Sequence, residues 1–423
     1  RQSPGFYLWL CLNNRQAETV AANLRFFLDE DDRDKVLVIP GSEADPYRGL
    51  SPHPAIASKR ATALWKLLNR SQGLIVVPMA SMAARMPSPA NFLSNCIHLE
   101  LGRFLPLDHL IKKLVQAGYV RQDPVSEVGD YSVRGGILDV FSPAQKNPAR
   151  IEFFGDEVES IREFDPATQR SIELIPSCEV VPVREMVLTE PEVARWHEEA
   201  PQYWNEIRFA EALQEKLQFT ESQELFNGFE YLFPLVADHS HHLLEFFPDG
   251  HDCTIVAPDL EGFLEQLDQA HSRQGEIFQE RQASGALVLP PERLFFDTSW
   301  LRRELEGRKI FSIRRLAESS QDVGHFDFQL ERKYKGRIQD VLADLKKWRA
   351  ARERVVFVTA SLGMAERMVD LLGENDIAVH LVRDGIDEAL SHDISVLQGN
   401  LSGGFYSAEL GLHFLTQDHI FEE

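Results

Sequence analysis

The sequence GDYSVRGGILDVF spans residues 129–141, and RIEFFGDEVESIR spans residues 150–162. In both stretches short runs of alternating apolar and polar side chains are separated by glycine-containing turns. Such alternation is typical of strands with one face against a core, and glycine permits the turns between neighbouring strands. The pattern predicts an antiparallel β-meander from Tyr131 to about Phe164.

Alternation also divides the side chains of residues 150–154 between two faces. Ile151 and Phe153 share the apolar face, whereas Arg150, Glu152 and Phe154 share the polar one. Arginine and aromatic side chains together are common anchors of protein interfaces. Phe154 is therefore either an exposed interface residue or one that strand twist or a second layer buries, and alternation alone leaves both open.

The segments around the meander predict a different architecture. Buried strands alternate with amphipathic helices, the strands at 6–10, 36–39 and 74–77 and the helices at 17–28 and 57–68. This order predicts a parallel α/β sheet, and a further strand at 253–257 indicates a return to the same domain. The β-rich module is thus expected to be inserted into an α/β domain.

The predicted organisation has four segments. Residues 1–101 and 187–320 are the two halves of the α/β domain, and residues 102–186 are the inserted module. Residues 325–423 form a small α/β domain with a strand at 355–359 and a helix that ends at Gly373.

Composition favours a protein partner and a reducing compartment. The 423 residues carry a net charge of −22, and residues 151–423 hold 26 Lys and Arg against 52 Asp and Glu. So acidic a chain is poorly suited to wrap duplex DNA through phosphate contacts alone. The four cysteines form no C-x-x-C pair, and no apolar run approaches the roughly 20 residues of a membrane span. We expect a cytoplasmic fragment, truncated or processed before Arg1.

No pattern in the sequence predicts catalysis, a cofactor or a metal. The phosphate-binding motif G-x-x-x-x-G-K-[ST] does not occur, and the Gly-Gly pairs at 135–136 and 403–404 lack its lysine. His241 and His242 are adjacent and point differently, so residues 238–242 are expected to be solvated surface rather than metal ligands. The Glu-rich run 157–199 is likewise expected to be a solvated face.

Residues 129–141 and 150–162 resemble the interaction domain that the excision-repair protein UvrB shares with transcription-repair coupling factors. The resemblance implies docking onto the damage-recognition protein UvrA through Arg134, Arg150 and Phe154. A second resemblance is to the first domain of the coupling factors, and it covers residues 45–47, 50–54, Arg60 and residues 226–235. The expected physical role of these residues is that of turn and core residues.

The resemblance implies a degenerate RecA- or helicase-like domain without a nucleotide site, in the N-terminal part of a coupling factor. It implies transcription-coupled nucleotide-excision repair, in which UvrA is recruited to RNA polymerase stalled at a lesion. The ATP- and magnesium-dependent DNA translocase and the contacts with polymerase and duplex DNA would lie beyond Glu423. The alternatives are a UvrB-like ATPase that binds damaged DNA, or an unrelated stand-alone α/β enzyme.

Overall fold

The computed structural model describes residues 5–221, 226–248, 253–313, 327–383 and 385–420. These residues form two compact units, which are described separately. The first consists of residues 1–17 and 37–313, and the second of residues 18–36 and 314–423.

The first unit contains a parallel sheet with strand order β13-β12-β1-β3-β2. Its strands are β1 (Phe6–Cys11), β2 (Val36–Val38), β3 (Gly73–Pro78), β12 (Cys253–Val256) and β13 (Ile310–Phe311). Phe6 of β1 pairs with Gly73 of β3 on one side and with Cys253 of β12 on the other. The sheet is therefore completed by chain that follows the meander, which confirms the predicted α/β class and the insertion.

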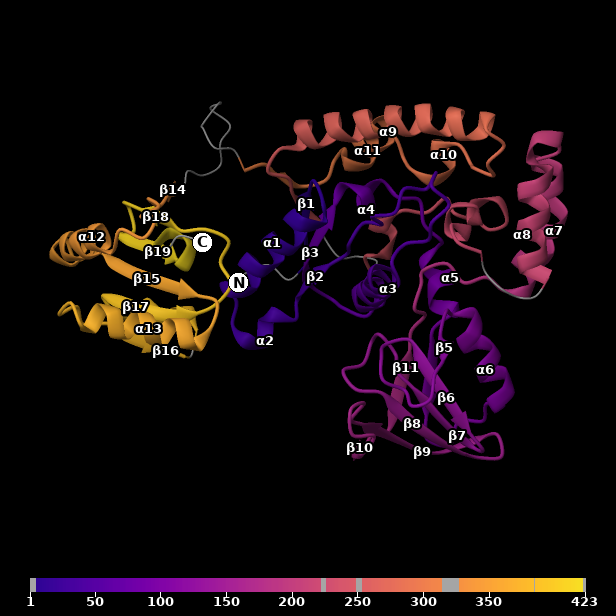
Figure 1. Ribbon diagram of the computed structural model, residues 1–423, viewed down its shortest axis with the longest axis horizontal. Helices are drawn as coiled ribbons and strands as arrows, with labels where there is room; N and C mark the ends of the chain where they lie inside the picture. The colour runs from indigo at the N-terminus through magenta and orange to yellow at the C-terminus, as the bar shows by residue number, and fades with distance from the viewer. Residues whose placement is uncertain (1–4, 222–225, 249–252, 314–326, 384, 421–423) are drawn as a thin grey trace. The chain divides into compact units, whose positions relative to one another are not determined.

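Helices cover this sheet because their apolar residues recur at helical spacing. They are α3 (Pro54–Leu68), α4 (Met79–Ala83), α5 (Pro89–Ser94), α9 (Leu260–Ala283) and α11 (Thr298–Leu305). The short helix α10 (Pro291–Leu294) contacts α9, and α1 (Asn14–Phe26) begins in this unit and continues in the second. Leu64 and Leu67 of α3 are fully buried against β1 and β3 in one hydrophobic cluster. Leu264 of α9 and Leu301 of α11 join the same cluster, and α9 and α11 lie side by side (Figure 1).

The inserted module is a six-stranded sheet with order β10-β9-β8-β7-β6-β5. Its strands are β5 (Val120–Arg121), β6 (Asp130–Arg134), β7 (Ile137–Val140), β8 (Ala149–Phe154), β9 (Glu157–Phe164) and β10 (Ser171–Leu174). All neighbours are antiparallel except β5 and β6. Helix α6 (Leu107–Gln116) buries Leu110 and Leu114 against the inner face. The sheet extends past both predicted limits, Tyr131 and Phe164.

The chain enters and leaves the module through two paired strands. Strand β4 (Ile97–Glu100) is antiparallel to β11 (Ser177–Val180), with Ile97 opposite Val180 and Glu100 opposite Ser177. This pairing brings the two ends of the insertion together, as an insertion into one continuous domain requires.

A helical region follows the module. It contains α7 (Glu190–Tyr203), α8 (Ala210–Glu221) and the short 3-10 helices η1 (Ile207–Phe209), η2 (Phe229–Tyr231), η3 (Phe233–Leu235) and η4 (Leu243–Phe246). Trp196 and Trp204 are fully buried here, with ring centroids 5.9 Å apart. The helical region therefore has an aromatic core of its own.

The second unit is a mixed sheet with order β14-β18-β19-β15-β17-β16. Its strands are β14 (Gln329–Leu330), β15 (Arg354–Thr359), β16 (His380–Val382), β17 (Ile394–Gln398), β18 (Phe405–Ser407) and β19 (Leu412–Thr416). Its helices are α2 (Glu30–Arg33), α12 (Ile338–Ala350), α13 (Leu362–Gly373), α14 (Ile386–Ala389) and α15 (Gln417–Ile420). Phe26, from the second half of α1, packs edge-on against Phe414 of β19 with ring centroids 6.3 Å apart. Residues 18–36 thus belong to this unit. The prediction instead places them in segment 1–101 and begins the small domain at residue 325.

Across the described ranges of both units, no helix is long and apolar enough to cross a membrane.

Candidate protein-interaction surface

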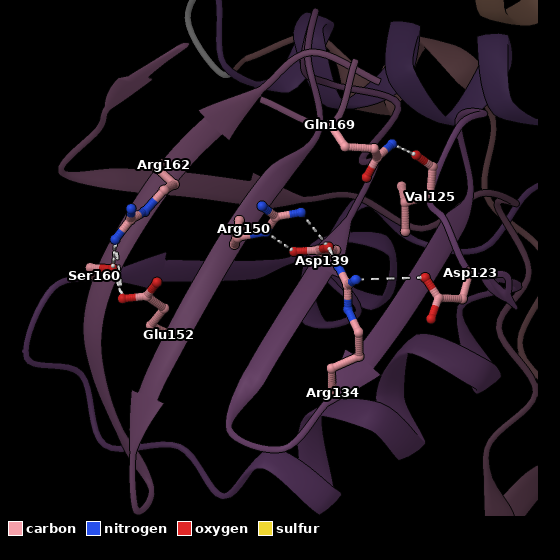
Figure 2. Close-up of polar contacts among 9 residues, drawn as sticks. All are labelled: Asp123, Val125, Arg134, Asp139, Arg150, Glu152, Ser160, Arg162 and Gln169. Atoms are coloured by element: carbon pink, nitrogen blue, oxygen red, sulfur yellow. Dashed lines mark hydrogen bonds and ion pairs between the residues drawn. The ribbon is translucent and has the colours of Figure 1, made fainter. Parts of the chain in front are cut away.

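Strand register places the polar side chains of the module on one outer face. Asp139 of β7 lies opposite Arg150 of β8, and Arg150 lies opposite Arg162 of β9. Arg134 of β6 lies opposite Ile137 of β7, and Ile137 is on the same face as Asp139 because the two are two residues apart on one strand. Because residues directly opposite one another in a sheet point to the same side, both predicted arginines belong to this outer face (Figure 2).

Asp139 holds the two arginines in place. Its carboxylate accepts hydrogen bonds from Nε and Nη2 of Arg150, at 2.7 and 2.8 Å, and one from Nη2 of Arg134 at 2.7 Å. The Asp139 side chain is only 1% exposed, so all of its acceptors face these two guanidinium groups. Charge-assisted, bidentate contacts of this kind fix orientation as well as adding energy.

The two arginines differ in how much they offer to a partner. The Arg134 side chain is 51% exposed, and its Nη1 lies 3.9 Å from Asp123 Oδ1. The Arg150 side chain is 18% exposed and its guanidinium lies over the Phe164 ring, 4.6 Å from the centroid. The hydrogen bond to Asp139 raises the pKa of Arg150 above its ordinary value. Arg134 therefore presents free donors to solvent, whereas Arg150 is largely held within the sheet.

Phe154 is the most exposed side chain of the three. It is 78% exposed at the end of β8, while its neighbour Phe153 is 8% exposed in the core of the module. Neither strand twist nor a second layer covers Phe154, so the alternative that it is buried is wrong. Gly155 follows with a φ of +64°, a conformation that glycine adopts without strain, and turns the chain into β9.

A second polar network lies on the same face. The Glu152 carboxylate accepts hydrogen bonds from Ser160 Oγ at 2.9 Å and from Arg162 Nη2 at 3.1 Å (Figure 2). Sequence reasoning assigned no role to Asp139 or Arg162. Alternation contained the signal for Asp139, because it lies between the buried residues Leu138 and Val140 and must therefore point outward with the arginines.

The residues that resemble the first domain of coupling factors are turn and core residues, as expected. Tyr47 is 2% exposed, and Arg60 is 6% exposed. The Arg60 guanidinium donates to Glu185 Oε2 at 3.0 Å, to Ser81 Oγ at 2.5 Å and to the Pro40 carbonyl at 2.6 Å. These contacts build one wall of a pocket of about 360 Å³ beyond the carboxyl ends of β2 and β3. Residues 226–235 contribute buried Phe226, Phe229 and Phe233 to the helical region.

The prediction that residues 238–242 are solvated surface is wrong for His239, which is 7% exposed, whereas His241 and His242 form ion pairs with Glu245. His241 Nδ1 lies 2.6 Å from Glu245 Oε2, and this hydrogen bond raises the pKa of His241. Among the described residues, no three His, Cys, Asp or Glu side chains are grouped in a way that could hold a metal ion. The four cysteines are free thiols, and burial raises the pKa of Cys11, Cys96 and Cys178 to about 12.

Residues 97–186 match the family described as the UvrB interaction domain. Almost the whole chain is also similar to transcription-repair-coupling factors. The protein from Myxococcus xanthus is 26% identical over 449 residues, which cover 97% of this chain and 36% of that protein. The protein from Bacillus subtilis is 25% identical, with coverage of 97% and 36%. The protein from Haemophilus influenzae is 26% identical, with coverage of 91% and 33%.

These comparisons confirm the resemblance that the sequence motifs indicated. The chain spans about a third of the length of the curated relatives that it matches. The matched domain includes every residue of the outer face described above.

Proposed function

We propose that this chain recruits UvrA as part of a transcription-repair coupling factor, delivering it to RNA polymerase stalled at a DNA lesion. The observation that carries the proposal is the outer face of the module, which Arg134, Arg150 and Phe154 share within residues that match the UvrB interaction domain. Similarity to coupling factors over 97% of the chain supports the role in transcription-coupled repair.

The surface suggests how the contact works. Phe154 supplies an exposed ring that an apolar pocket of the partner would bury, and aromatic anchors of this kind dominate binding energy at protein interfaces. Arg134 supplies free guanidinium donors for a carboxylate. Arg150 contributes mainly by fixing the Asp139 carboxylate, which in turn holds the Arg134 guanidinium in place.

The remaining functions belong, in this proposal, to the rest of the longer protein. The ATP- and magnesium-dependent translocase and the contacts with polymerase and duplex DNA are assigned there. The net charge of −22 supports this division, because so acidic a chain is poorly suited to bind duplex DNA through phosphate contacts.

Calorimetric titration of the purified chain with UvrA tests the proposal. We expect Arg134→Ala and Phe154→Ala each to weaken binding by about 2 kcal/mol, or roughly 30-fold. The melting temperature should stay unchanged in Phe154→Ala, whose side chain is exposed, and should fall slightly in Arg134→Ala, because buried Asp139 loses one of its two guanidinium partners. Arg150→Ala is expected to weaken binding and also to lower the melting temperature, since Arg150 is mostly buried and pairs with Asp139.

Arg195→Ala is the matched control for Arg134. Its side chain is 46% exposed, against 51% for Arg134, and it forms one surface ion pair with Glu192 on α7. This variant should bind UvrA like the wild type. Wild-type affinity in both Arg134→Ala and Phe154→Ala would show that the recruitment proposal is wrong.

A further inference from the structure

Residues 102–105 run beside the start of β9 as an additional short strand. The backbone N–H of Gly102 donates to the Val158 carbonyl at 2.9 Å, and that of Val158 donates to the Arg103 carbonyl at 3.0 Å. The N–H of Leu105 donates to the Asp156 carbonyl at 2.7 Å. These bonds place Phe104 in an antiparallel bridge directly opposite Glu157.

Glu157 connects this strand to the surface described above. On its other side Glu157 lies opposite Phe154 in the β8–β9 hairpin. Residues opposite one another point to the same side of a sheet, so Phe104, Glu157 and Phe154 form one row across the outer face. Neighbouring strands are about 4.8 Å apart, which separates the Cα atoms of the two phenylalanines by roughly 10 Å.

Both phenylalanine side chains in this row are exposed to solvent. Phe104 is 71% exposed and Phe154 is 78% exposed. Single exposed apolar side chains are ordinary, but two large exposed rings in one row offer a partner two apolar anchors. The two rings share this face with Arg150, which lies four residues before Phe154 on β8. Arg134 is on the same face but two strands away, on β6, in the row that contains Glu152.

The carboxylate between the rings determines what can cover them. Glu157 is exposed, and within the described parts of the chain its side chain has neither a hydrogen bond nor an ion pair. A purely apolar cover would bury this charge without compensation, which is costly. A cover with a lysine or arginine side chain at its centre would bury both rings and pair with Glu157.

We propose that Phe104 and Glu157 extend the UvrA-docking surface, and that UvrA covers this row with an apolar patch spanning both rings and a basic side chain opposite Glu157. The inference rests on the proposed function and specifies the chemistry of its partner. The surface is then bipolar: Arg134 faces an acidic group of the partner, and Glu157 faces a basic one. Such an arrangement also sets the orientation in which the two proteins dock.

The test is a set of calorimetric titrations with UvrA on the whole chain. We expect Phe104→Ala to weaken binding roughly tenfold, and Glu157→Lys to weaken it by at least roughly tenfold with a smaller loss for Glu157→Gln. The loss in Glu157→Lys should shrink as salt is raised, because screening weakens the repulsion between like charges. Melting temperatures should stay at the wild-type value, since both side chains are exposed.

A double variant and a matched control sharpen the result. Phe104→Ala combined with Phe154→Ala should lose less affinity than the product of the two single losses, because both rings meet one patch of the partner. Ile207→Ala is the control, since Ile207 is 94% exposed on η1, outside the module. It should bind like the wild type.

The outcomes separate this inference from the proposed function. Loss of binding in Arg134→Ala and Phe154→Ala, with wild-type binding in Phe104→Ala and Glu157→Lys, would overturn the inference and leave the function standing. Wild-type binding in all four would overturn both. Self-association of the chain that depends on Phe104, with UvrA binding unaffected, would also overturn the inference, because the row would then join two copies of this chain.

Discussion

Asp139 shows how one buried side chain organises the surface of the module. It is 1% exposed and neutralises charge between two guanidinium groups, each of which it contacts at 2.7 Å. Removing one member of a buried ion pair is costly because the other charge is left without compensation. The contacts also restrict the rotamers of Arg134 and Arg150 before any partner arrives, which reduces the entropy lost on binding.

His413 of β19 has a similarly enclosed position in the second unit. Its Nδ1 lies 2.9 Å from Glu331 Oε2, its Nε2 lies 3.0 Å from Glu353 Oε2, and its ring stacks on Trp348 at 4.0 Å. Burial disfavours the charged ring, but the hydrogen bonds to Glu331 and Glu353 outweigh it and raise the pKa of His413. The protonated ring therefore stabilises this unit.

The raised pKa predicts how the stability of the second unit depends on pH. The stabilisation from His413 is complete below the unfolded pKa of about 6.5, and it is lost as pH rises through the higher folded value. We expect the wild type to exceed His413→Gln in urea midpoint at pH 6, with a smaller difference at pH 9. Comparing the two proteins at each pH cancels the titration of groups that do not contact His413. A difference that is the same at pH 6 and pH 9 contradicts the prediction.

At the scale of elements, the strands that sequence reasoning located are those with a strong burial pattern. In β8 the burial of Ala149, Ile151 and Phe153 alternates with exposure, so the faces of this strand could be predicted. In β1 and β3 nearly every residue is wholly or partly buried, which produces the continuous apolar runs of a parallel sheet.

The elements that were missed carry no such pattern. Both residues of β5 and all four of β10 are exposed, so hydrophobicity reports nothing about their pairing. Residues 102–105 join the sheet mainly through backbone hydrogen bonds, which any sequence could make, and Leu105 is their one side chain that packs against the hydrophobic cluster of the module. The exposure of Phe104 depends on that pairing, and for this reason it could not be predicted. Arg134, Arg150 and Phe154 could be identified through a family resemblance. The contacts of Asp139 could not be predicted, because they depend on how β6, β7 and β8 are aligned with one another.

The module has the attributes of an element that folds by itself. Its hydrophobic cluster, which includes Leu99, Leu110, Leu138 and Ile151, comes from residues 97–183, and β4 pairs with β11 to close the two ends. We predict that residues 97–186, produced alone, unfold cooperatively in urea. Leu138→Ala should destabilise the isolated module by about 3 kcal/mol, because Leu138 is fully buried. Circular dichroism during urea titration checks both, and a gradual, non-cooperative transition contradicts the prediction.

At the scale of the whole molecule, the parallel sheet of the first unit can be compared with nucleotide-binding α/β domains, which also have a helix after their first strand. In such domains the backbone N–H groups after the first strand point at the phosphates, and the loop contains glycine. Here β1 leads directly through Leu12 and Asn13 into α1. The N–H of Leu12 donates to Gln16 Oε1 at 2.7 Å, and the N–H of Gln16 donates to Asn13 Oδ1 at 2.9 Å. Side chains of the protein therefore occupy donors that a phosphate would need.

This geometry predicts that the chain neither binds nor hydrolyses ATP, which distinguishes a recruitment segment from a damaged-DNA-binding ATPase. Asn14 strengthens the expectation, because its Nδ2 holds the Glu43 carboxylate at 2.8 Å and so places a negative charge beside this turn. A ligand that binds the native state at 100 times its Kd stabilises it by about 2.7 kcal/mol, so binding would be visible as a higher melting temperature. We expect millimolar ATP with magnesium to leave the melting temperature unchanged and phosphate release to stay at background.

Gln16→Ala and Asn13→Ala free the two amide groups, and they should still not bind ATP because the lysine of the phosphate-binding motif is absent. A nucleotide-dependent rise in the melting temperature of the wild type would favour the ATPase.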